Sequence, residues 1–70
     1  GSNMKISATA GGISITGMKP NGKVAVFDAS GKQVAAAYSD ANGNVSVDMG
    51  NSGKGVFVVN TPDNSFKFIK

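Results

Sequence analysis

The fold class of this chain is decided by the stretch Lys23-Val24-Ala25-Val26-Phe27-Asp28-Ala29-Ser30-Gly31-Lys32-Gln33-Val34. Its first half is a run of β-branched and aromatic residues, which pack well on the pleated surface of a strand. A turn follows, because Asp28 can hydrogen-bond its own backbone and Gly31 accepts positive φ. A second apolar run then begins at Gln33. The stretch therefore predicts a β-hairpin with strands over 23–28 and 33–38.

Turn-forming residues recur at short and even spacing on both sides of this hairpin. They delimit five further short runs, at residues 4–10, 13–16, 44–49, 55–60 and 65–70. The runs at 44–49 and 65–70 alternate between apolar and polar side chains, which indicates strands with one buried and one wet face. Val24–Phe27 and Val56–Val59 are apolar throughout, so we expect two central strands that are covered on both faces.

Seven strands with regular turns predict an all-β fold, a small seven-stranded antiparallel immunoglobulin-like β-sandwich. A five-stranded barrel is the alternative. A helix over 33–41 has only its alanines in its favour, since the stretch lacks a clear apolar stripe. Seventy residues suffice for one domain with a modest core. We expect residues 1–3 to be a cloning remnant and 4–70 to form a single domain.

The composition argues against an enzyme. The chain contains no Cys, His, Glu or Arg, and its charges are seven Lys and four Asp. It therefore lacks a disulfide framework, a thiolate metal site and the usual general base near neutral pH. The lysines are scattered, and without Arg no bidentate contact to phosphate or guanine is possible, so we expect no nucleic-acid partner. No apolar run approaches the roughly 20 residues of a membrane helix, so we expect no direct membrane insertion. We also expect no cofactor.

Two segments resemble ligand loops only in part. Residues 40–51 place oxygen ligands at alternate positions, as a calcium loop does, but Val45 stands where Gly is required and Asn51 where a bidentate Glu is required. Residues 50–55 hint at a phosphate loop, yet the first Gly and the magnesium-binding hydroxyl are missing. We interpret both as turns. The five aromatic residues lie in apolar runs and predict core packing, with Tyr38 the one expected to be partly exposed.

Three motifs occur in a specific order. They are the hairpin Val24–Val34, the strand Lys54–Val59 beginning Lys-Gly-Val-Phe, and the closing Lys67-Phe68-Ile69-Lys70. Together they resemble the C-terminal sorting domain (type A) of cargo proteins of the type IX (Por) secretion system of Bacteroidetes. The resemblance covers nearly the whole chain. It departs from the family pattern at residues 49–52, where Met-Gly-Asn-Ser replaces the more usual apolar-rich approach to the Lys-Gly strand, and at Phe68, where Ile or Val is commoner.

The resemblance implies a non-catalytic signal on a larger cargo protein, which crosses the outer membrane by way of the periplasm and is anchored at the cell surface after a sortase removes the signal. The implied partners are the type IX translocon, the sortase and an upstream cargo domain. The implied recognition residues are Gly55, Lys67, Phe68, Ile69 and Lys70. A terminal strand at a sheet edge also offers backbone groups for strand addition, including pairing with a second copy. The alternative function is an immunoglobulin-like accessory or substrate-binding module of a secreted hydrolase.

Overall fold

The computed structural model describes residues 4–50 and 53–70 of the chain. These residues form seven strands and no helix. The strands are β1 (Lys5–Ala8), β2 (Gly12–Thr16), β3 (Lys23–Phe27), β4 (Gln33–Tyr38), β5 (Val45–Asp48), β6 (Val56–Asn60) and β7 (Ser65–Ile69). Each coincides with one of the seven runs expected from the sequence. The all-β prediction is therefore confirmed, and the alanine-rich segment is a strand.

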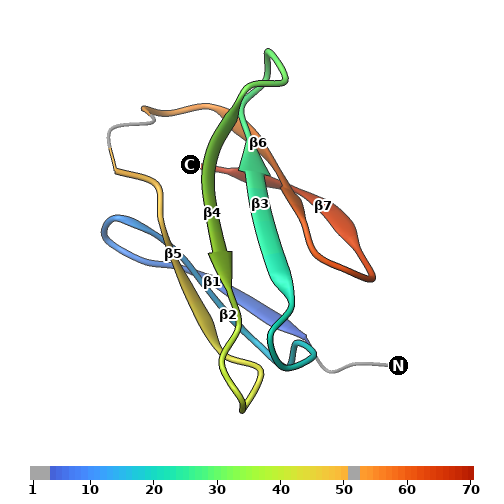
Figure 1. The fold of residues 1–70 in the computed structure, drawn as a ribbon. Helices are drawn as coiled ribbons and strands as arrows, with labels where there is room; N and C mark the ends of the chain where they lie inside the picture. Colours follow the sequence, from blue (N-terminus) through green and yellow to red (C-terminus); the bar gives the residue numbers. More distant parts are fainter. Residues whose placement is uncertain (1–3, 51–52) are drawn as a thin grey trace.

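The strands form two antiparallel sheets, in the orders β1-β2-β5 and β4-β3-β6-β7 (Figure 1). The backbones of the two sheets come closest where β4 lies against β5, which leaves β1 and β7 as the edges on the opposite side. The arrangement is the predicted seven-stranded sandwich. It differs from the constant-type immunoglobulin order in one strand, since β4 pairs with β3 and not with β5.

The core lies between the sheets and follows the period-2 alternation of the strands. Cross-strand partners such as Ile13 and Val47, or Val26 and Val59, point inward together. The buried cluster consists of Ile13, Ile15, Met18, Val24, Val26, Val45, Val47, Met49, Phe57 and Val59. β3 and β6 are the two central strands of the larger sheet, as predicted. The prediction that both of their faces are covered is wrong for β6, because Val56 is exposed and Val58 is only half-buried.

A buried serine connects the end of β4 to the turn before β3. The Ser39 hydroxyl donates to the carbonyl of Lys19 and accepts the N–H of Gly22 at 2.8 Å. The backbone N–H of Ser39 also donates to the Gly22 carbonyl at 2.9 Å. Asn21, in the same turn, adopts φ 58°, a left-handed conformation that Asn tolerates. These bonds satisfy polar groups inside the sandwich and fix the path of the loop.

Candidate functional site

The five predicted recognition residues all belong to the terminal β6–β7 hairpin or its last rung. Gly55 and Lys70 exchange two backbone hydrogen bonds, with N···O distances of 3.4 and 3.0 Å, just beyond the ends of the two strands. Within the hairpin, Phe57 pairs with Phe68 and Val56 pairs with Ile69. The tertiary structure therefore places four of these residues on or next to the edge strand β7 and Gly55 before the neighbouring β6.

The closing strand presents its side chains to both faces of that sheet. Phe66 and Phe68 point inward and pack, half-buried, against the core cluster. Lys67 and Ile69 point outward, and Ile69 is 72% exposed. Ile69 therefore does not contribute to the core, because the period of the strand puts it on the opposite face from Phe68. Of the predicted recognition side chains, Lys67 and Ile69 are accessible and Phe68 is largely a packing residue.

β7 is an edge strand with free backbone groups. In an antiparallel pair, residues that exchange two hydrogen bonds alternate with residues that exchange none. Gly55 with Lys70 is a bonded pair, and Thr61 donates to the carbonyl of Asn64 at 2.8 Å. The register between these two rungs makes Phe66 and Phe68 the residues of β7 that bond to β6. The N–H and C=O groups of Ser65, Lys67 and Ile69 therefore point away from β6, and no strand in the described part of the chain pairs with them.

The two sheets differ sharply in the chemistry of their outer faces. In β1-β2-β5 the outward residues are Lys5, Ser7, Gly12, Ser14, Thr16, Ser46 and Asp48. In the larger sheet most outward residues are apolar, and we call these the outer patch: Ala25, Phe27, Ala36, Tyr38, Val56, Val58 and Ile69. Lys23, Asn60, Ser65 and Lys67 share this face, and Ala25 within the patch is buried. Tyr38 is 66% and Val56 40% exposed, so the prediction for Tyr38 is confirmed. Within the described residues, the smaller sheet has no such apolar patch on its outer face. The outer patch of the larger sheet is therefore a surface suited to contact with another molecule.

Sequence reasoning missed the outer patch. The signal was present, since the runs around Phe27 and Val58 do not alternate. Such a run is equally compatible with a second covered face and with an exposed apolar face. Only the sheet order, which places nothing from the described residues over this face, distinguishes the two.

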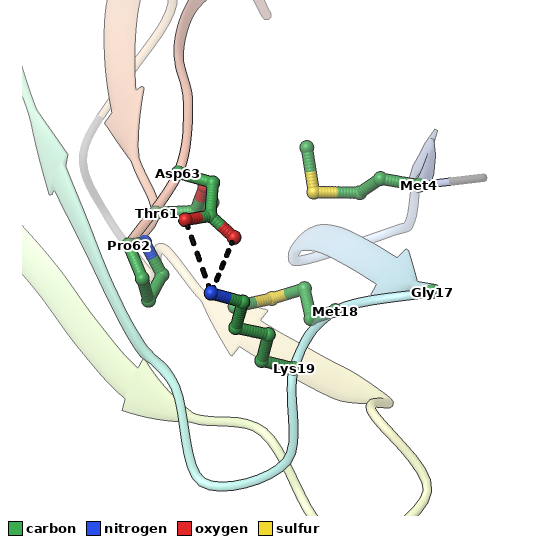
Figure 2. Close-up of a pocket in the computed structure, with 7 residues that line it drawn as sticks. All are labelled: Met4, Gly17, Met18, Lys19, Thr61, Pro62 and Asp63. Atoms are coloured by element: carbon green, nitrogen blue, oxygen red, sulfur yellow. Dashed lines mark hydrogen bonds and ion pairs between the residues drawn. The ribbon is translucent and has the colours of Figure 1, made fainter. Parts of the chain in front are cut away.

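A hollow of about 470 Å³ opens at one end of the sandwich, between the start of β1 and the β6–β7 turn. Figure 2 shows Met4 and Met18 on one side of it and Pro62 on the other. Lys19 Nζ lies 3.3 Å from Asp63 Oδ2 across the opening. Both of these side chains are more than half exposed, so their attraction is largely screened by water. The hollow lies at the end of the sandwich, and among the described residues that line it Met18 is the one that belongs to the buried cluster.

The calcium-like segment folds as a tight turn. Oδ1 of Asp40 accepts the backbone N–H groups of Asn42 and Asn44 at 2.8 and 2.9 Å. The bonds from Asn44, then Asn42, hold the pKa of Asp40 below its usual range. Asp28 does the same in the β3–β4 turn, where the Ser30 hydroxyl and the N–H of Lys32 lower its pKa. Within the described residues no group of three or more His, Cys, Asp or Glu side chains could hold a metal. Asn51, at position twelve of the loop, and part of the phosphate-like loop lie outside the described residues.

Gly55 is required for its backbone conformation. Its φ is 135°, and a Cβ added there would meet nothing within 4 Å. We therefore expect Gly55→Ala to destabilise the domain by roughly 1–3 kcal/mol through backbone strain alone. D-alanine at the same position, introduced by semisynthesis, should restore stability in urea unfolding because a D-residue favours positive φ. If the two alanine forms unfold alike, the strain explanation is wrong.

The fold and the terminal hairpin define the class of this protein as a small β-sandwich domain whose last strand is an open edge. Comparison with protein-family models, with curated proteins and with solved structures found no match. Among the described residues, no helix is long and apolar enough to cross a membrane.

Proposed function

We propose that this domain is a non-catalytic secretion and sorting signal of the kind found at the end of type IX secretion cargo. The ordered motifs of the hairpin at 24–34, the strand at 54–59 and the closing residues 67–70 support it. The observation that carries the proposal is the free edge of β7. It displays the backbone of Ser65, Lys67 and Ile69 beside the accessible side chains of Lys67 and Ile69.

A signal on folded cargo has to be readable without unfolding the domain. β7 meets this requirement because its inward side chains hold it to the core. Its backbone groups that point away from β6 remain available for pairing. Lys67 keeps the edge soluble and discourages unselective pairing with other strands. On this proposal the translocon and the sortase are the partners, the cargo domain lies upstream, and the route leads through the periplasm to the outer-membrane surface.

The test is export of a reporter fused to this domain in a bacterium that has the type IX system. The intact fusion should reach the cell surface, and a fusion lacking Lys67–Lys70 should remain in the periplasm. Surface labelling and fractionation measure both, and circular dichroism of the purified domains reports folding. Equal export of the two fusions would exclude these four residues as the signal. Retention of both fusions, with both folded, would overturn the sorting proposal.

The outer patch favours one other candidate, an accessory or substrate-binding module of a secreted hydrolase. The exposed Tyr38 offers an aromatic ring for stacking on a sugar, and Phe27 lies further along the same sheet face. Titration with soluble polysaccharides separates the two functions. Binding that is lost in Tyr38→Ala and independent of Lys67–Lys70 would support the accessory module.

A further inference from the structure

We infer that the free edge of β7 accepts a partner strand of defined pattern, with apolar residues facing the core side and an acidic residue opposite Lys67. This inference rests on the proposed function and deepens it, since it specifies the chemistry of the strand that the edge recognises. The pattern follows from the two faces of β7 and from the charge at its centre.

The inner face of β7 sets the apolar positions. Phe66 and Phe68 are half-buried, whereas inward residues of the neighbouring β6, Phe57 and Val59, are fully buried. Inward residues at the facing edge strand are also half-buried, as Ile6 shows. The inward side chains of the edge strands β1 and β7 are thus partly open to solvent, as those of the other edge strand, β4, also are. A strand added to β7 would place its own inward side chains beside Phe66 and Phe68 and bury more of them.

The outer face of β7 sets the charge. Lys67 is the middle one of the three residues whose backbone is free, and it points outward between Ser65 and Ile69. No carboxylate pairs with it within the described residues, where the ion pair is that of Lys19 with Asp63. The outward residues of β3, β4, β6 and β7 include Lys23 and Lys67 but no Asp. A carboxylate directly opposite Lys67 therefore adds a favourable cross-strand pair at a site that has none.

The same lysine argues against a second copy of this chain as the occupant. Antiparallel self-pairing in the register of greatest overlap places Lys67 opposite the same lysine of the other copy. Like charges directly opposite each other destabilise a strand pair. Lys67 therefore disfavours pairing of β7 with a second β7 and favours pairing with an acidic strand. The repulsion between like charges is what makes the edge selective.

The inference is tested with the isotope-labelled domain and a capped five-residue peptide, valine-valine-glutamate-valine-threonine, followed by NMR. Antiparallel pairing centred on the glutamate puts valines beside Phe68 and Phe66. We expect saturable shifts and slowed hydrogen exchange at the amides of Ser65, Lys67 and Ile69, whose N–H groups are free. The amides of Phe66 and Phe68 already bond to β6 and should keep their protection.

Charge reversal supplies the matched control. Replacing the peptide glutamate by lysine should weaken binding about fivefold, as should Lys67→Glu in the domain. Combining the two changes should restore the affinity, and added salt should reduce the differences. The inference is overturned by a lack of saturable shifts, by shifts confined to the outer patch, or by binding indifferent to the central charge. Shifts of the three amides on simple concentration of the domain would identify a second copy as the occupant and would equally overturn it.

The peptide-binding experiment and the export experiment can refute their two hypotheses independently. A domain that binds the acidic peptide while export ignores Lys67–Lys70 would keep its acceptor edge and lose its sorting role. A domain whose export needs those residues but which binds no peptide would keep the sorting role and lose the acceptor pattern.

Discussion

Replacing Gly12 by alanine is expected to lower the midpoint of thermal unfolding by about 10–25 °C. A Cβ at Gly12 would lie 1.9 Å from the carbonyl oxygen of Val47 and 3.0 Å from the backbone N of Met49. Both are backbone atoms, so no side-chain rotation can relieve the clash. β2 and β5 would have to separate where Gly12 pairs with Asp48.

Gly11 provides the control for this prediction. A Cβ there has Asp48 Oδ1 as its neighbour, at an ordinary 3.8 Å. Gly11→Ala should therefore unfold within a few degrees of the wild type, or slightly above it, because alanine restricts the unfolded chain. Thermal melts followed by circular dichroism compare the two neighbours directly. Equal melting of the two variants would show that the close approach of β2 to β5 is not a constraint in solution.

Replacing Lys67 by proline is expected to reduce export of a reporter fusion about tenfold or more while the domain stays folded. Proline lacks an N–H, and the N–H of Lys67 points to the free edge and not to β6. The β6–β7 ladder therefore loses no hydrogen bond, and proline is tolerated on edge strands with this orientation. A partner strand, in contrast, would lose a donor and meet the ring.

Two further substitutions serve as controls for Lys67→Pro. Lys67→Ala removes the charge and keeps the N–H, so the difference between it and Lys67→Pro isolates the backbone contribution. Phe66→Pro removes a ladder bond to β6 and should unfold the hairpin, which circular dichroism would register. Undiminished export of a folded Lys67→Pro fusion would rule out strand addition at this edge as the means of recognition.

The sequence alone determined the strands. Alternation at 44–49 and 65–70, the apolar runs at 24–27 and 56–59, and the turns between them gave seven strands near their observed bounds. This worked because period 2 and turn chemistry are local properties, written into neighbouring residues. The composition likewise limits the chemistry of the side chains. That the chain contains no Cys, His, Glu or Arg is known from the sequence without any structure.

Only the tertiary structure decided what each strand exposes. Val56 and Val58 have neighbours typical of a buried strand, but their sheet has an uncovered outer face. Ile69 and Phe68 are apolar neighbours, yet the pleat of β7 turns Phe68 toward the core and leaves Ile69 exposed. Gly12 gave no sign that it touches Val47, and the free backbone of Lys67 depends on register with Val58. Sheet order, register and close approach are relations between residues far apart in the chain, so no local pattern specifies them.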